Sequence, residues 1–176
     1  YTDGTVKPAN NITRAEVATI FFRLLDDSVR EKYMTRENPF SDVKEGSWFN
    51  VAISTMSAMG IINGYPDGTF NPNGFITRAE FVDLLVRLRP DAYGTAAFPD
   101  VPAWHWAADA IGAAVSLGWI NGYPDGTFGP EKGLTRAEAC TIVNRTIERN
   151  PHEDQLHEDM IVWVDNPAPG EVGHQW

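Results

Sequence analysis

Three arginines recur inside one four-residue motif. Arg14, Arg78 and Arg136 each take the second position of Thr-Arg-Ala-Glu. The threonine and glutamate predict a capping box at a helix start, in which each side chain accepts a hydrogen bond from the other residue's backbone N–H. An arginine there lies at the positive end of the helix dipole, which costs roughly 0.3–1 kcal/mol. Its N–H donors must therefore have another partner, and they suit carboxylates and carbonyl oxygens.

Other reactive side chains show no catalytic or metal-binding pattern. Cys140 is the single cysteine, which excludes an internal disulfide, and its apolar helix face predicts a buried small hydrophobe. There is no Gly-x-Ser-x-Gly elbow, no P-loop and no supported Cys/His pair. The four histidines lack metal-ligand spacing: His105, His152, His157 and His174. We therefore expect no catalytic residues, no cofactor and no metal.

The charge balance limits the classes of partner. With 14 basic and 24 acidic residues among 176, the net charge is −10. Nucleic-acid binding without sequence preference needs a basic surface, so we expect no nucleic acid and no attraction to anionic lipid. No apolar run approaches the roughly 18 residues of a spanning helix, so we expect no membrane insertion. The chain begins inside a motif, and we expect it to be cut from a longer protein.

An internal repeat positions the three motifs. The segment that starts at Phe40 aligns with the segment that starts at Phe98, and Thr77 and Thr135 show the same offset of 58 residues. Residues 1–33 read as the second half of the same unit, residues 40–89 and 98–149 as complete units, and residues 150–176 as a linker and a partial start of a further unit.

Each unit is expected to form two helices around a loop. The first helix is predicted at residues 47–59 and 105–117, with Gly60 and Gly118 as left-handed C-caps. A Pro-Asp-Gly turn follows, and the second helix begins at Thr-Arg-Ala-Glu; in the 40–89 unit it ends before Pro90. Residues 26–39, 89–97 and 149–159 read as linkers. One such pair cannot bury its apolar faces alone, so the units must pack together in a mainly α fold.

The order of motifs resembles the S-layer homology repeat of bacterial cell-surface proteins. The unit reads Phe-x-Asp-Val, His-Trp-Ala, Asn-Gly-Tyr-Pro-Asp-Gly-Thr-Phe and Thr-Arg-Ala-Glu, most fully at residues 98–101, 105–107, 121–128 and 135–138. The resemblance implies a three-fold pseudo-symmetric bundle of three repeats, with grooves between units. One repeat would be split between the chain ends, and we expect residues 1–25 and 160–176 to lie near each other.

The resemblance also implies a function at the bacterial cell wall. Such domains anchor secreted proteins non-covalently to secondary cell wall polysaccharide linked to peptidoglycan, typically through pyruvylated sugars. A ligand carboxylate would receive the backbone N–H groups at the helix start and a charge-assisted bond from the adjacent arginine. The alternative is an arginine that bonds a neighbouring carbonyl or acid and braces the units. Ligand binding is favoured for Arg78 and Arg136, and for Arg14 the two interpretations are equal.

Further candidates for ligand contact recur beside the arginines. Asp42 and Asp100 are expected either to accept sugar hydroxyls or to cap the turn before the first helix. Trp48 and Trp106 could present a face to a sugar, although the core is the favoured place for them. Asn63 and Asn121 either touch ligand or, preferably, bond the turn backbone. A second arginine follows each motif arginine by nine positions, on the opposite helix face, and is expected to form a structural ion pair: Arg23, Arg87 and Arg145.

Two other functional classes remain as alternatives. The first is a protein–protein assembly module whose grooves bind neighbouring surface-layer proteins. The second is a fragment of a carbohydrate-active enzyme with paired carboxylates. The recurring acidic residues are capping-box glutamates and turn aspartates, which have structural explanations, so the anchoring interpretation is preferred.

Overall fold

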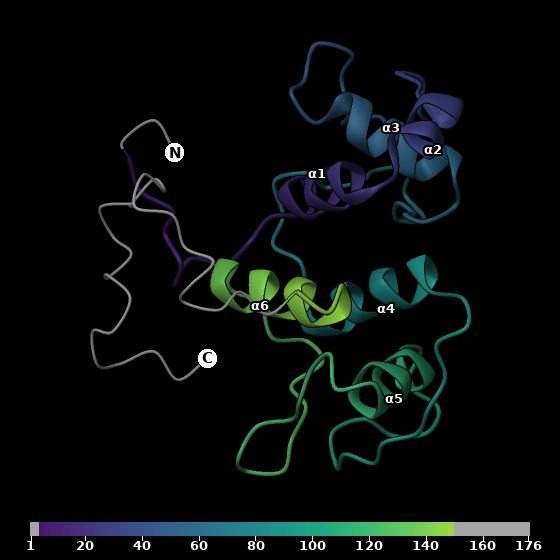
Figure 1. The fold of residues 1–176 in the computed structure, drawn as a ribbon. Helices are drawn as coiled ribbons and strands as arrows, with labels where there is room; N and C mark the ends of the chain where they lie inside the picture. The colour runs from purple at the N-terminus through teal and green to yellow at the C-terminus, as the bar shows by residue number, and fades with distance from the viewer. Residues whose placement is uncertain (1–3, 150–176) are drawn as a thin grey trace, which may run out of the picture.

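A computed structural model describes residues 4–149, which form six helices joined by loops (Figure 1). The fold is mainly α, and no strand occurs within this range beyond isolated bridges. The helices are α1 (Arg14–Leu24), α2 (Asp27–Tyr33), α3 (Asn50–Ala58), α4 (Arg78–Leu88), α5 (Ala108–Ser116) and α6 (Arg136–Thr146).

The three motif helices start as the sequence predicts. Thr13, Thr77 and Thr135 are the N-caps of α1, α4 and α6, and each forms a complete capping box with the glutamate three residues later. α4 ends at Leu88, two residues before Pro90, which cannot continue a helix.

The other helix of each complete unit begins three residues later than predicted. Residues 47–50 and 105–108 form turns instead, because Phe49 and Ala107 take the N-cap positions and have no side-chain acceptor. The C-terminal prediction is confirmed, since Gly60 and Gly118 follow α3 and α5 with φ of 72° and 70°.

A short helix, α2, lies within residues 26–39, the segment that was expected to link two units, and the sequence analysis did not predict it. The Asp26 carboxylate accepts a hydrogen bond from the Ser28 N–H at 2.9 Å and caps the helix. α2 has no buried residue and packs against α3. Its local capping signal is sufficient to form one or two turns without a contribution to the core.

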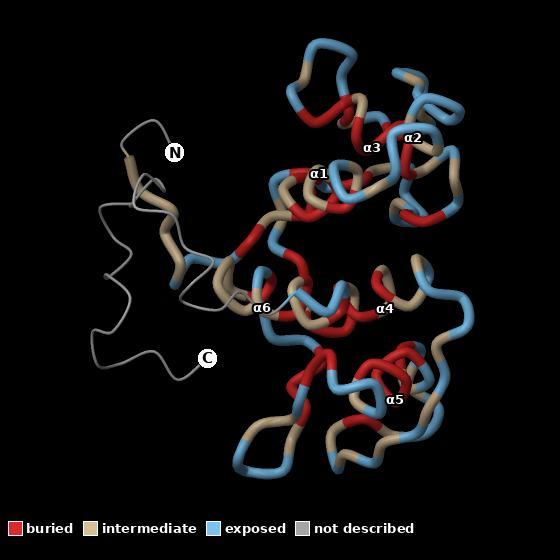
Figure 2. Tube along the Cα trace, viewed as in Figure 1, coloured by how far each residue is buried: buried red, intermediate tan, exposed pale blue. Residues whose placement is uncertain are grey.

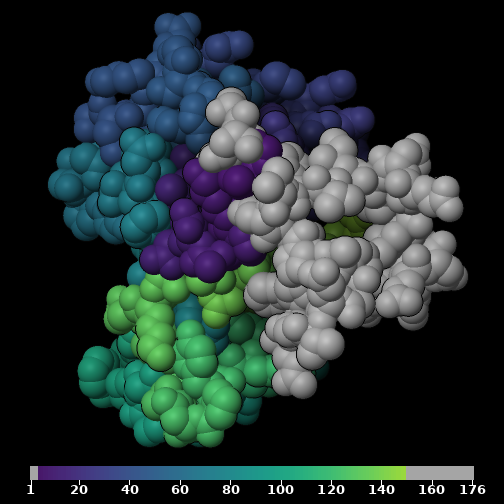
Figure 3. Space-filling view, turned by 90° about the vertical axis from the view of Figure 1, so that its left-hand side faces the viewer, coloured from purple at the N-terminus to yellow at the C-terminus, as the bar shows by residue number. Residues whose placement is uncertain are grey.

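A ring of backbone hydrogen bonds joins the three units at the segments before α1, α4 and α6. The Ile12 N–H donates to the Leu134 carbonyl at 2.9 Å, the Leu134 N–H to the Ile76 carbonyl at 3.1 Å, and the Ile76 N–H to the Ile12 carbonyl at 3.2 Å. All three residues are buried. Figure 2 marks the buried stretches of the chain in red, including much of α5. Figure 3 shows the purple N-terminal segment between the teal and green surfaces.

The core continues from this ring into the helices. Phe21 of α1 and Phe81 of α4 lie with ring centroids 5.5 Å apart, and both are buried. α3 packs against α1, and α5 packs against α4. Within residues 4–149, no helix packs in this way against α6.

Cys140 of α6 is exposed, so the expectation of a buried hydrophobe is wrong. Ala18 of α1 and Val82 of α4 stand at the corresponding positions and are buried. The physical reason is the missing neighbour, since the helices that pack on α1 and α4 have no described counterpart over α6. Residues 160–176, which were expected to lie near residues 1–25, fall outside the described residues.

Candidate ligand-binding grooves

The backbone N–H groups at the start of each motif helix donate hydrogen bonds to loop carbonyls of another unit. The N–H groups of Arg14 and Ala15 donate to the carbonyls of Gly74 and Pro72, both at 2.9 Å. The same bonds join α4 to Lys132 and Pro130, and α6 to Asn10 and Pro8. The expectation that these N–H groups receive a ligand carboxylate is therefore wrong, because each already has an acceptor from another unit.

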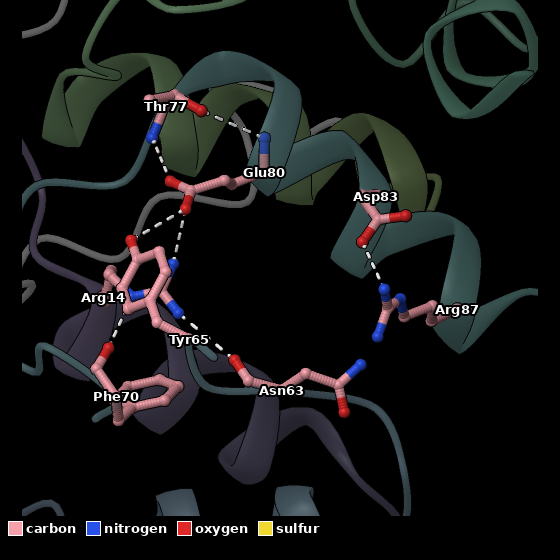
Figure 4. Close-up of polar contacts among 8 residues, drawn as sticks. All are labelled: Arg14, Asn63, Tyr65, Phe70, Thr77, Glu80, Asp83 and Arg87. Carbon is pink, nitrogen blue, oxygen red and sulfur yellow. Dashed lines mark hydrogen bonds and ion pairs between the residues drawn. The ribbon is translucent and has the colours of Figure 1, made fainter. Parts of the chain in front are cut away.

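The Arg14 side chain, like its backbone N–H, bonds to the neighbouring unit (Figure 4). Nε donates to the Phe70 carbonyl at 2.8 Å, Nη2 to the Asn63 carbonyl at 3.3 Å and Nη1 to Glu80 Oε1 at 2.7 Å. The guanidinium carbon lies 4.7 Å from the ring centroids of both Tyr65 and Phe70. Only 8% of the residue is exposed, so these partners offset the desolvation of its charge.

Arg78 and Arg136 make equivalent contacts at the other two junctions. Arg78 donates from Nε to the Phe128 carbonyl at 3.0 Å and from Nη2 to the Asn121 carbonyl at 2.8 Å. Arg136 donates from Nε to the Val6 carbonyl at 2.7 Å and from Nη1 to Glu16 Oε1 at 2.6 Å. All three arginines thus brace one unit against the next, which is the alternative that the sequence left open.

Two grooves adjoin the braced junctions. The first groove has a cavity volume of about 150 Å³ and includes Arg14, Asn63, Tyr65, Glu80, Asp83, Arg87 and Trp106 in its lining. The second groove has a cavity volume of about 260 Å³ and includes Arg78, Asn121, Tyr123, Glu138, Thr141 and Arg145. Each groove therefore combines a motif arginine with the second arginine of the next unit, and not with the second arginine of its own helix.

Asp42 and Asp100 hold the loops beside the grooves and line neither groove. Asp42 accepts hydrogen bonds from the N–H groups of Phe70 and Asn71 at 2.8 and 2.7 Å. Asp100 accepts from Phe128 and Gly129 at 2.9 and 2.7 Å. Burial raises the pKa of Asp100, but the hydrogen bonds from the backbone N–H groups of Phe128, Gly129 and Asp100 itself together lower it by more, so that the pKa lies below its ordinary value.

Both candidate tryptophans lie at the surface, so the preference for a core position is wrong. Trp48 is 66% exposed and makes an edge contact with Phe49. Trp106 is 60% exposed and forms part of the first groove, although it belongs to the following unit. Both precede their helices, which begin too late to turn these side chains inward.

The asparagines and the tyrosines position the motif arginines. The backbone carbonyls of Asn63 and Asn121 accept from Arg14 and Arg78, while both residues also line a groove. Sequence reasoning missed Tyr65 and Tyr123, whose rings lie 4.7 and 4.6 Å from the arginine carbons. Their recurrence at the 58-residue offset was the available signal.

The second arginines differ from one another. Arg87 forms the expected ion pair, with Nη2 at 2.8 Å from Oδ2 of Asp83. Arg145 has no carboxylate partner within residues 4–149, so the expectation is not met there. Both also line a groove, a role that the sequence analysis did not assign to them.

Residues 4–149 contain neither a helix that could span a membrane nor a side-chain cluster that could hold a metal ion. Among residues 4–149, none of the six helices has the length and apolar character needed to cross a membrane. The same range contains no group of three or more histidine, cysteine, aspartate or glutamate residues that is arranged to hold a metal ion.

Comparisons with known proteins identify relatives along most of the chain. The family described as S-layer homology domain matches residues 1–18, 39–82 and 97–140. A cellulosome-anchoring protein of Acetivibrio thermocellus is 40% identical over 96% of this chain. Cell surface glycoprotein 1 of the same organism is 38% identical over 86%, and an amylopullulanase of Thermoanaerobacterium thermosulfurigenes is 34% identical over 85%. The chain spans 38%, 7% and 8% of these relatives, respectively.

Proposed function

Because the chain belongs to the S-layer homology domain family, we propose that it anchors an exported protein non-covalently to the bacterial cell wall. The ligand is a secondary wall polysaccharide linked to peptidoglycan, with pyruvylated sugars held in the grooves between units. A relative named as a cellulosome-anchoring protein and another named as a cell surface glycoprotein support a cell-surface role.

The grouping of arginines in the grooves is the observation that carries this proposal. The chain has a net charge of −10, yet each described groove contains two arginines from different units. In the second groove the two arginines outnumber the one carboxylate, Glu138, and this local positive potential on an acidic protein attracts an anionic polymer. The exposed face of Trp106 beside Arg14 and Arg87 adds an apolar surface suited to a sugar ring.

The proposal assigns no catalysis to this chain. The carboxylates nearest the motif arginines also close the capping boxes of their helices: Glu16, Glu80 and Glu138. The relative named as an amylopullulanase contains the matched region as 8% of its length, so its name describes a much larger protein.

Sedimentation with purified cell walls tests the proposal. We expect the chain to sediment with walls that retain their secondary polymer and to stay in solution with walls from which the polymer has been removed chemically. A soluble pyruvylated fragment of the polymer should compete. Equal binding to both wall preparations would contradict the proposal, and binding only to walls that retain surface proteins would favour the assembly alternative.

A further inference from the structure

The two described grooves differ in charge at one corresponding position. The residue six places after the capping threonine is Asp83 in α4 and Thr141 in α6, and each lines the groove beside its own helix. The first groove therefore contains two arginines and two carboxylates, which balance. The second groove contains two arginines and one carboxylate, which leaves a net positive charge.

Asp83 also forms an ion pair with Arg87, the second arginine in the first groove. Its carboxylate lies 2.8 Å from Arg87 Nη2. The Asn63 amide lies beside the same guanidinium (Figure 4), and with its oxygen turned toward Arg87 it accepts from Nη1 at 2.5 Å. In the second groove, Thr141 directs its hydroxyl to the Ala137 carbonyl at 3.0 Å. No carboxylate within residues 4–149 pairs with Arg145.

The motif arginines show the same difference. In the first groove, Arg14 Nη1 lies 2.7 Å from Glu80 Oε1, which also accepts a hydrogen bond from the Tyr65 hydroxyl at 3.1 Å. In the second groove, Arg78 Nη1 is 3.8 Å from Glu138 Oε1, which is beyond hydrogen-bond distance. Lys132 adds a third cation, with Nζ 4.0 Å from the ring centroid of Tyr123.

We infer that the second groove binds the anionic group of the wall polymer, that the first groove takes an uncharged part of it, and that Asp83 and Thr141 set this preference. The inference rests on the proposed function. Unpaired guanidinium donors can form charge-assisted bonds with a carboxylate without breaking an existing pair, whereas the first groove would have to give up such pairs.

Exchange of these two residues tests the inference. The probes are the pyruvate ketal of methyl glucoside and its methyl ester, which differ chiefly in charge. Titrations followed by NMR report on both grooves at once, through the backbone amides of Gly64 in the first and Gly122 in the second. We expect the acid, and not the ester, to bind more tightly at the second groove.

Each variant should reduce this preference, Thr141→Asp by a change at the second groove and Asp83→Thr by a change at the first. Thr141→Asp is expected to weaken binding of the acid at the second groove by about five- to tenfold, and Asp83→Thr to strengthen it at the first groove by a similar factor. Thr141→Asn and Asp83→Asn separate charge from shape. The Thr141→Asn variant should bind as the unmodified chain does, and Asp83→Asn should behave as Asp83→Thr. The differences should shrink at high salt.

Equal affinity for the acid at both grooves, or an exchange with no effect, would overturn the inference while leaving wall binding intact. If neither probe shifts either amide, the inference is also overturned. The sedimentation assay then decides separately whether the proposed function stands.

Discussion

The guanidinium of Arg78 lies over the rings of Tyr123 and Phe128, with its carbon 4.6 and 4.8 Å from their centroids. It also donates to two loop carbonyls of another unit, so that the side chain is both a brace and part of a groove. Arg145 lines the same groove and has no ion pair among the described residues. The two arginines therefore allow the structural and the binding contributions to be separated.

Arg78→Ala should lower both stability and wall binding. The substitution leaves two loop carbonyls and Glu138 without their cation, and we expect a loss of about 2–4 kcal/mol in the free energy of unfolding. Arg145→Ala should weaken wall binding and leave the melting temperature nearly unchanged. Thermal melting and wall sedimentation on both variants check this. A stable Arg78→Ala variant would show that the bracing contacts contribute little.

Asp100 should make stability depend on acidity through the loop that it holds. Its pKa in the folded state lies below the ordinary value of 3.8, so its contribution is present above about pH 4 and is lost as the pH falls through the lower folded value. Asp100→Asn should therefore be less stable at neutral pH and lose less stability on acidification. Melting temperatures between about pH 7 and pH 2 measure the difference. Parallel curves for the two proteins would contradict this expectation.

At the scale of elements, some helix ends could be predicted from local sequence signals and others could not. The capping boxes and the two C-cap glycines were readable from the sequence because each depends on residues within a single turn. The partners of Arg78 were not readable, because its acceptors are backbone carbonyls 43 and 50 residues away and any residue type supplies a carbonyl. The exposure of Trp106 was likewise missed, since its side chain depends on where α5 begins.

α3 contains a buried polar side chain that its counterpart helix lacks. Both side-chain atoms of the Asn50 amide are buried without a hydrogen-bond partner, and Ala108 stands at the corresponding position in α5. Asn50→Ala should raise the free energy of unfolding by about 1–3 kcal/mol, because it removes an unpaired amide and adds a better helix former. Urea denaturation measures this. Ala108→Asn is the matched reverse change and should destabilise. Destabilisation by Asn50→Ala as well would contradict the expectation, because it would mean that the buried amide contributes favourably to the fold.

At the scale of the whole molecule, the three junctions repeat one set of contacts in cyclic order. The unit of α1 donates to the loop before α4, that of α4 to the loop before α6, and that of α6 to residues 8 and 10. The repeat offset predicted that such units pack together, whereas only the structure reveals the order of the contacts. The N-terminal segment, residues 8–12, thus closes the assembly.

Removal of residues 1–10 should therefore loosen the opposite end of the described chain. The truncation deletes the carbonyls of Pro8 and Asn10, which accept from the N–H groups of Arg136 and Ala137. We expect hydrogen exchange at these two amides to become at least about tenfold faster, with a smaller change at Arg78 and Ala79. Asn10→Ala is the control, because it keeps the backbone carbonyl. Unchanged protection of α6 in the truncated chain would contradict the cyclic account.

The backbone ring of Ile12, Ile76 and Leu134 is closed on itself. Each of these residues uses its single N–H on one neighbour and its carbonyl on the other, so all three N–H donors already have an acceptor within the ring. A β-sheet grows at its edges because its outer strand keeps free donors and acceptors. This ring has no outer member. A further unit could join this ring only if one of its three hydrogen bonds were broken first.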